Sequence, residues 1–189
     1  MFADSSFQFS TKLKNMGRPA LVLLIVVAGF QLLTSCREIV VYPDEPVVEF
    51  KEISIRDTTD VLDNPVKLVT ITFQLIDGNG DVGLDSTQIE GPFDPDSAFH
   101  FNLIINEYHP VNGSLVPVPL PGGLKKYRIP DLTPSGQNKT LKADVSVKIE
   151  YPYSQAQPLP HSELQYLFYV YDRALNPSNR DTTDPVIFF

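Results

Sequence analysis

The segment Ala143-Asp-Val-Ser-Val-Lys-Ile-Glu-Tyr151 alternates apolar and polar side chains without a break. A period of two is the pattern of a β-strand that turns one face to a core and the other to water. We therefore expect a strand whose inward side chains are those of Val145, Val147, Ile149 and Tyr151.

The same period recurs on both sides of that segment. Val69-Thr-Ile-Thr-Phe-Gln-Leu75 is a second clean alternation, and residues 99–105 carry a third. Residues 164–171 are apolar on both faces, which predicts a central strand that is covered from both sides. Residues 48–55 hold two short alternations out of phase, and a β-bulge near Lys51-Glu52 would correct that slip.

Turn signals separate these strands. Asn112-Gly113 predicts a tight hairpin, because both residue types tolerate positive φ. The prolines of residues 115–121 remove ladder donors, so that segment is expected at a sheet edge or in an extended loop. Seven or eight short strands with such turns predict an all-β fold, an antiparallel β-sandwich over residues 47–189. A β-barrel is the alternative architecture.

The N-terminus has the layout of a bacterial lipoprotein signal. Basic residues precede the uncharged apolar run of residues 20–30, which is shorter than the roughly 20 residues of a comfortable membrane span. The run leads to Leu33-Thr-Ser-Cys36, which resembles a lipobox. We expect residues 1–35 to form a signal peptide helix that is cleaved. We expect Cys36 to be acylated, with palmitate among its acyl chains. An uncleaved anchor with an incidental cysteine is the alternative.

Residues 36–46 are then expected to be the lipidated cysteine and a short tether. Arg37 stands where inner-membrane lipoproteins of proteobacteria carry aspartate, which favours an outer-membrane lipoprotein of the cell envelope. Its periplasmic or surface exposure stays open. Cys36 is also the only cysteine, so no intramolecular disulfide can form.

Charge excludes one class of partner. Cleavage before Cys36 takes three basic and one acidic residue from totals of 15 and 23, which leaves 12 and 22 and a net charge near −10. Such a surface repels nucleic acid and anionic headgroups, so contact with the membrane is expected only through the lipid anchor.

One loop carries candidate metal ligands. In Asp77-Gly-Asn-Gly-Asp-Val-Gly83, side-chain oxygens occupy every second position and glycines lie between them. Asp77, Asn79 and Asp81 match the first three ligand positions of an EF-hand loop, and Ca²⁺ is the cofactor that such oxygens favour. The later EF-hand positions lack their glycine and glutamate. The structural alternative is a glycine-rich turn with solvated aspartates.

A second loop follows a strand near the C-terminus, Tyr171-Asp-Arg-Ala-Leu-Asn-Pro-Ser-Asn179. Asp172 and Asn176 can fix such a turn through hydrogen bonds to backbone NH groups. If the fold brings this turn beside residues 77–81, Asp172 can complete a cation site. Both roles stay open for Asp172.

These two loops also carry a resemblance. Residues 73–84 and 169–179, together with the middle segment 127–141, look like a family of uncharacterised lipoproteins of the Bacteroidota. The resemblance covers most of residues 47–189 and implies an immunoglobulin-like domain in the envelope. It implies no activity.

The sequence does not indicate an enzyme. The three histidines lack the spacing of a zinc site, and no nucleophile elbow or phosphate-binding loop occurs. We expect a non-catalytic binding or structural module for a protein or glycan partner, with Tyr108, Tyr151 or Tyr153 in its contact surface. A small envelope hydrolase on the same scaffold is the alternative, and it would need paired carboxylates or a histidine–acid pair in a cleft.

Overall fold

The computed structural model of the protein describes residues 41–119 and 122–189 together with the single positions 19 and 22. The predicted signal peptide and Cys36 lie outside the described residues. Residues 41–189 form one compact unit, whose regular secondary structure is almost entirely antiparallel strand. The strands are β1 (Val47–Thr59), β2 (Pro65–Asp77), β3 (Leu103–Val111), β4 (Ser114–Pro117), β5 (Leu124–Tyr127), β6 (Leu141–Pro152), β7 (Glu163–Val170), β8 (Asp181–Thr182) and β9 (Val186–Ile187).

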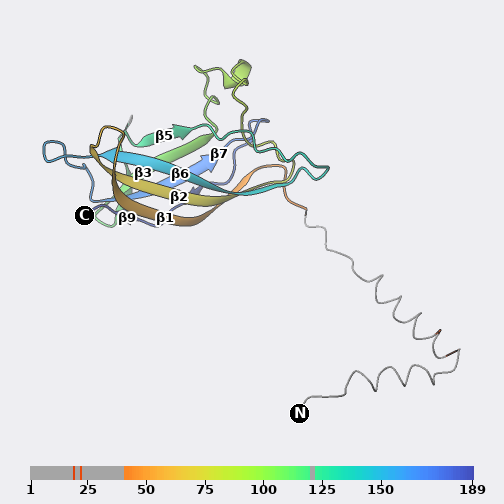
Figure 1. The fold of residues 1–189 in the computed structure, drawn as a ribbon, viewed down its shortest axis with the longest axis horizontal. Helices are drawn as coiled ribbons and strands as arrows, with labels where there is room; N and C mark the ends of the chain where they lie inside the picture. The colour runs from red at the N-terminus through yellow and green to blue at the C-terminus, as the bar shows by residue number, and fades with distance from the viewer. Residues whose placement is uncertain (1–18, 20–21, 23–40, 120–121) are drawn as a thin grey trace, which may run out of the picture. The chain divides into compact units, whose positions relative to one another are not determined.

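Two sheets form the sandwich that the alternating segments predicted (Figure 1). The first sheet has the order β1-β2-β6. The second has the order β4-β3-β7-β8, with β5 also pairing with β3 and β9 with β7. This order corresponds to the A-B-E and C-F-G strands of an immunoglobulin-like sandwich. Besides the strands, the described residues from 41 onward contain one short 3-10 helix, η1 (Gly91–Phe93).

The core lies between the sheets and is built from the inward positions of the alternating strands. Val147 and Ile149 of β6 are buried, as are Phe73 of β2 and Phe168 of β7, whose ring centroids lie 4.9 Å apart. Apolar burial of this kind is the main stabilising contribution in a domain without a disulfide. The fully buried side chains include Val48, Val66, Val69, Ile71, Leu75, Val82, Leu103, Ile105, Tyr166 and Val170.

The predicted irregularities of the strands are confirmed. The register of β1 against β2 shifts between Phe50 and Glu52, where the bulge was expected. Asn112 and Gly113 both have positive φ and join β3 to β4, and β4 lies at the edge of its sheet. The prediction that β7 is covered on both sides is confirmed only in part, because one face of the strand is buried and the other is half-buried.

One predicted strand is displaced. Residues 99–105 were expected to be extended throughout, but β3 begins at Leu103. Asn102 is buried, and its side-chain oxygen accepts a hydrogen bond of 2.6 Å from the backbone N of Ile129. Phe99 packs edge-on against Tyr171 at a centroid distance of 5.0 Å. Asn102 keeps backbone hydrogen bonds to Tyr127 and Tyr171, but its side chain and that of Phe99 contact neighbouring segments, and the regular strand begins only at Leu103.

The chain enters the sandwich at the end where β2 finishes, because Val47 pairs with Ile76. The last residues of the predicted tether, 41–46, are described at this end. The backbone N of Gly78 donates a hydrogen bond of 2.8 Å to the carbonyl of Pro43, and Pro46 is buried. Residues 43–46 therefore lie against the sandwich.

Candidate functional site

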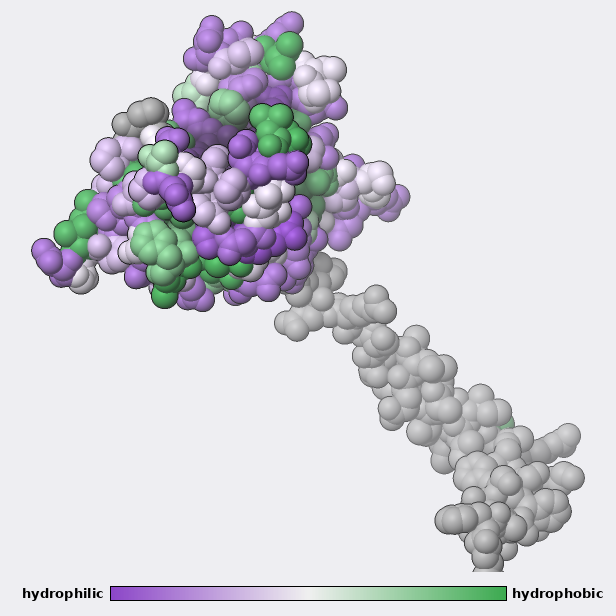
Figure 2. All heavy atoms as spheres, turned by 60° about the vertical axis from the view of Figure 1, so that its left-hand side comes forward, coloured by the Kyte–Doolittle hydropathy of each residue, from purple (hydrophilic) through white to green (hydrophobic). Residues whose placement is uncertain are grey.

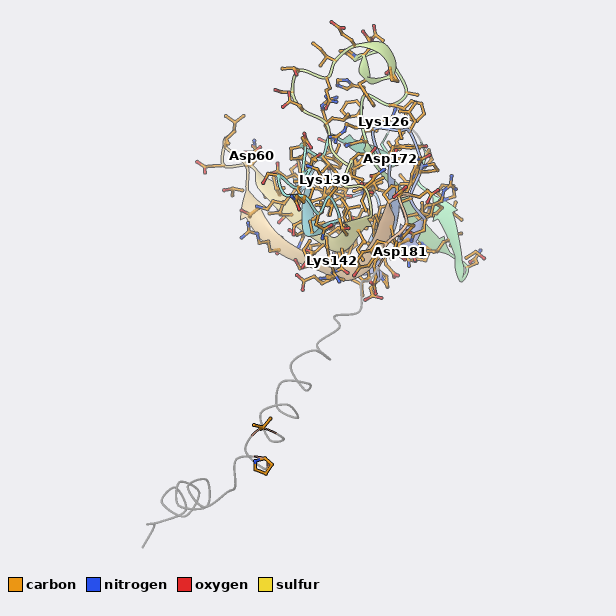
Figure 3. The ribbon with its side chains drawn as sticks, turned by 90° about the vertical axis from the view of Figure 1, so that its right-hand side faces the viewer. Asp60, Lys126, Lys139, Lys142, Asp172 and Asp181 are labelled. Carbon is orange, nitrogen blue, oxygen red and sulfur yellow. The ribbon has the colours of Figure 1, made fainter. Side chains whose placement is uncertain are left out.

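The two loops with candidate metal ligands meet at one end of the sandwich. β2 ends at Asp77, and β7 ends just before the turn that holds Asp172. An antiparallel bridge joins Val82 to Asp172, and the backbone N of Arg173 donates to the carbonyl of Asp81 at 3.2 Å. Figure 3 looks onto this end, with Asp172 near its centre. Segments about ninety residues apart in the sequence are thus neighbours.

The glycines of the first loop are explained by packing between backbones. A Cβ on Gly78 would collide with the carbonyls of residues 42 and 43, and a Cβ on Gly80 with the carbonyl of Lys139. Gly80 also has φ +67°, a region that favours glycine. These contacts account for the glycines without any bound ion.

Asp77 and Asp81 form the unusual part of this loop. Asp77 is fully buried, and its Oδ2 accepts a hydrogen bond of 2.9 Å from the backbone N of Val82. Its Oδ1 and the Oδ1 of Asp81 are also buried, and neither has a hydrogen-bond partner among the described residues. Burial raises the pKa of Asp81 to about 6, helped by the charges of Asp172 and Asp77. The alternative of solvated aspartates is therefore wrong for Asp77.

The other two candidate ligands have structural partners of their own. Both carboxylate oxygens of Asp172 accept hydrogen bonds from Asn176, at 2.7 Å from its backbone N and 2.8 Å from its amide. The exposed Asn79 accepts a bond of 3.2 Å from the backbone N of Asp81. In the described part of the chain, no group of three or more His, Cys, Asp or Glu side chains is arranged to hold a metal ion. The four predicted residues thus gather at one end without forming a ring of carboxylates.

Arg173, a basic residue in the turn beside Asp81, binds other groups. The guanidinium of Arg173 donates to Asp131 at 3.0 Å, to Thr133 at 2.7 Å and to the carbonyl of Gly83 at 3.2 Å. Arg173 and hydrogen bonds from Thr133 lower the pKa of Asp131 to about 2, the Thr133 bonds being the larger cause. Arg173 therefore joins three loops instead of neutralising Asp77 or Asp81 through a direct ion pair.

A cavity of about 210 Å³ lies at the opposite end, where β6 finishes and β7 begins. Its lining is mostly apolar. Figure 2 brings this end forward and shows separate small apolar patches among hydrophilic residues, so a recess is a better candidate here than a flat apolar face. The lining residues are Glu107, Val118, Gly122, Lys125, Tyr151, Leu159, Pro160, His161, Leu164 and Phe188.

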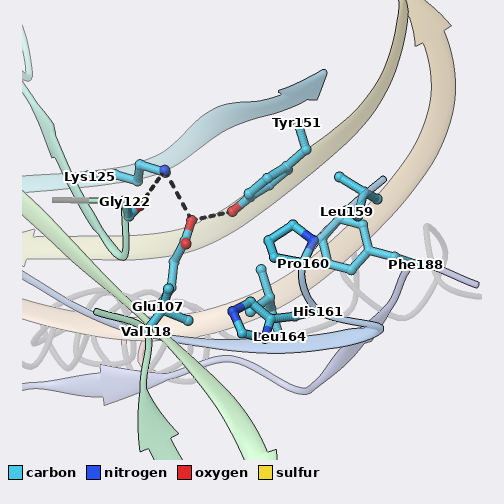
Figure 4. A pocket seen from close by; sticks show the side chains of 10 residues that line it. All are labelled: Glu107, Val118, Gly122, Lys125, Tyr151, Leu159, Pro160, His161, Leu164 and Phe188. Carbon is cyan, nitrogen blue, oxygen red and sulfur yellow. Dashed lines mark hydrogen bonds and ion pairs between the residues drawn. The ribbon is translucent and has the colours of Figure 1, made fainter. Parts of the chain in front are cut away.

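A buried acid stands in the wall of this cavity (Figure 4). Glu107 is 4% exposed, and its carboxylate accepts a hydrogen bond from the Tyr151 hydroxyl. Because the hydroxyl proton of Tyr151 is donated to Glu107, the Tyr166 hydroxyl must donate to the Tyr151 oxygen, which lies 3.0 Å away. Lys125 lies 3.4 Å from the same carboxylate. Burial, with the charges nearby, raises the pKa of Tyr151 and of Tyr166, so both stay protonated donors.

A histidine lines the same cavity. His161 stacks on His109 with ring centroids 4.2 Å apart, and burial lowers its pKa further than the charge of Glu107 raises it. No hydrogen bond between His161 and Glu107 occurs among the described residues. Both carboxylate contacts of Glu107 go to Tyr151 and Lys125 (Figure 4). The cavity thus contains a histidine and an acid, as the hydrolase alternative requires, but the two side chains are not hydrogen-bonded to each other.

The cavity was not predicted, although one signal for it was present. The alternation over residues 99–105 continues to Glu107, which places an acid at an inward position. Tyr151 was correctly expected to point inward, and it lines the cavity. Tyr108 borders a neighbouring recess, and Tyr153 lies on the surface, where its hydroxyl donates to Asp57 at 3.3 Å.

The predicted anchor lies outside the described residues. Among the residues that are described, no helix has the length and apolar character to cross a membrane.

Comparison with known proteins adds no relative. The chain matches no protein-family model, and no curated protein or solved structure is significantly similar to it. The resemblance to Bacteroidota lipoproteins therefore stays a prediction.

Proposed function

We propose that this chain is an outer-membrane lipoprotein, held by an acylated Cys36, whose sandwich binds a protein partner and catalyses no reaction. The observation that carries the proposal is the cavity beside Tyr151. It is a mainly apolar recess with a few polar groups in its wall, which is the usual composition of a binding site.

The place of the cavity suits an anchored module. The chain enters the sandwich beside Asp77, and the cavity lies at the other end of the sheets. The seven residue steps from Cys36 to Pro43 span at most about 25 Å when extended. An anchor on Cys36 would thus attach at the end remote from the cavity and leave the cavity accessible.

The chemistry of the lining favours a protein over a glycan. Val118, Leu159, Leu164 and Phe188 offer apolar surface, and the volume of about 210 Å³ suits one large apolar side chain. A sugar ring would need several hydrogen bonds, whereas the lining has few polar side chains, and Oε1 of Glu107 is already bonded to Tyr151 and paired with Lys125. We therefore expect an apolar side chain of the partner to fill the cavity.

The anchor is tested by metabolic labelling with palmitate in a bacterial host. The wild-type chain is expected to incorporate the label and to sediment with membranes. Cys36→Ala should do neither. Equal labelling of both proteins would exclude Cys36 as the acylated residue.

The binding role is tested with a photo-crosslinking amino acid at position 159 of the full-length, membrane-bound protein. One defined protein adduct is expected, and Val118→Phe should abolish it by filling the cavity. Val116→Phe, which makes the same change outside the cavity lining, should not. A crosslinker at Val61, which is 99% exposed at the same end of the sandwich, provides the background. An adduct that persists in Val118→Phe, or that is a glycan, contradicts the proposal.

A small hydrolase is the second candidate, because His161 and Glu107 line one cleft. It predicts that the purified chain hydrolyses chromogenic esters or glycosides, and that His161→Ala and Glu107→Gln each abolish this activity. Hydrolysis that survives both substitutions would not arise in this cavity.

A further inference from the structure

Two buried carboxylate oxygens at the Asp77 end of the sandwich have no hydrogen-bond donor among the described residues. More than nine in ten buried polar groups in folded proteins have a hydrogen-bond partner, and an unpaired one costs free energy. Asp77 is fully buried, yet its Oδ1 has no donor in the described residues, and neither has the Oδ1 of Asp81. Something outside the protein's own described groups would stabilise these two oxygens.

The surrounding charges indicate a positive species. The carboxyl groups of Asp77 and Asp81 interact directly, and Asp172 adds a third negative charge nearby. The one cation among the charges that act on Asp81 is Arg173, whose guanidinium is bound to Asp131 and Thr133. The two orphaned oxygens thus lie in an excess of negative charge.

We propose that Asp77 and Asp81 bind one calcium ion through these two oxygens. Carboxylate oxygens suit a hard cation, and calcium accepts an irregular shell of six to eight oxygens that includes backbone carbonyls and water. The absence of a third acidic ligand within reach, among the described residues, excludes a shell made only of carboxylates. Loop carbonyls and water would supply the remaining ligands. Asp172 acts indirectly, because Asn176 occupies both of its oxygens.

The position of this ion would matter to the anchored protein. The loop that contains Asp77 and Asp81 contacts the incoming chain at Pro43 through Gly78 and the turn after β7 through Arg173. Calcium would therefore stiffen the end at which the chain enters the sandwich. The inference does not depend on the cavity at the other end or on its partner.

A shared proton is the competing explanation. One proton between the two carboxyl groups would also satisfy both oxygens, without any metal. The two explanations differ in their response to calcium at constant pH, and that difference defines the experiment.

The experiment measures thermal unfolding of the full-length chain in detergent at pH 7.5, in EDTA and in increasing calcium chloride. At a calcium concentration ten times the dissociation constant, the unfolding equilibrium constant should fall about 11-fold, which raises Tm by about 3–6 °C for a domain of this size. Isothermal titration calorimetry should give one site per chain.

Asp81→Asn tests the residue directly. It should abolish the response to calcium, while its Tm in EDTA equals or exceeds that of the wild type because one of two like charges is gone. Asp77→Asn should also abolish the response, but its burial makes misfolding a risk, so Asp81→Asn is the decisive variant. Asp96→Asn removes an equal charge from the exposed segment after η1 and should keep the full response.

Three results would overturn the proposal. The first is no change of Tm or heat signal up to 10 mM calcium. The second is a calcium response that Asp81→Asn retains. The third is an equal response in magnesium at the same concentration, which would indicate a general effect of divalent salt.

Discussion

Replacing Tyr151 by phenylalanine removes a single oxygen from the wall of the cavity, and the structure allows its cost to be worked out. The Tyr151 hydroxyl donates to the carboxylate of Glu107, which is only 4% exposed. A hydrogen bond to a charged group contributes about 1.5–3 kcal/mol, and its loss leaves a buried charge with one partner fewer. Lys125 remains 3.4 Å away and still offsets part of that charge. The buried Tyr166 hydroxyl also loses the oxygen to which it donates. We therefore expect a destabilisation of at least about 2 kcal/mol, the middle of that range.

The assay is guanidinium unfolding of the full-length chain in detergent, followed by circular dichroism, with a thermal melt beside it. A loss of about 2 kcal/mol corresponds to a fall of about 4–8 °C in Tm for a domain of this size. Tyr153→Phe is the matched control, because that hydroxyl donates to the exposed Asp57 at 3.3 Å. The control should change stability by less than about 0.5 kcal/mol.

The pH dependence adds a second readout. Because the pKa of Tyr151 is raised in the folded state, the unfolded chain releases its phenolic proton first, near pH 10. Wild-type stability should therefore fall as the pH rises above about 10, and Tyr151→Phe should lose less over the same range. A double-mutant cycle with Glu107→Gln should show a coupling above about 0.5 kcal/mol.

Two results would refute this reasoning. One is a Tyr151→Phe variant as stable as Tyr153→Phe. The other is strict additivity with Glu107→Gln, which would mean that Tyr151 and Glu107 do not interact in solution.

Three further predictions concern the framework of the sandwich. Asn179→Ala should cost about 2 kcal/mol in denaturant unfolding, because this side chain accepts from the N of Val48 and donates to its carbonyl, both at 2.8 Å. Phe73→Ala should cost about 3–5 kcal/mol in the same assay through the void it leaves beside Phe168, and a smaller loss would mean that the core collapses into the gap. Asp131→Asn should lower Tm at pH 7. The pKa of Asp131 is lowered to about 2, so its contribution is complete above about pH 4 and disappears as the pH falls towards 2, and the gap between variant and wild-type melting curves should close over that range.

Most of the architecture was predictable because strand signals are local. The alternation in residues 69–75 and 143–151 determines which side chains face inward, and both segments lie in strands with that orientation. The bulge near Phe50 followed from a slip of phase within one strand. The displaced start of β3 was not predictable, because it depends on contacts with distant segments, such as the hydrogen bond that the Asn102 side chain accepts from Ile129.

The candidate sites were predictable only in part. Asp77 and Asp81 were selected by their spacing, but the burial of Asp77 was missed, although the alternation from Val69 to Leu75 continues to that position. Glu107 was missed in the same way. In both cases a charged residue occupies an inward position of a strand, and composition alone suggests exposure for such a residue.

By itself the sequence determined the strands, their inward faces, the hairpin at Asn112 and the candidate ligands in the loop after β2, because each depends on neighbours along the chain. Tertiary structure decided which ends meet. It placed the Asp172 turn beside Asp81, although the carboxylate of Asp172 accepts hydrogen bonds from Asn176. It also brought Glu107 and Tyr151 into contact from opposite sheets. These contacts depend on which distant strands pair and on how the two sheets stack. A pattern of period two determines which side chains face inward, but it does not identify the partner strand.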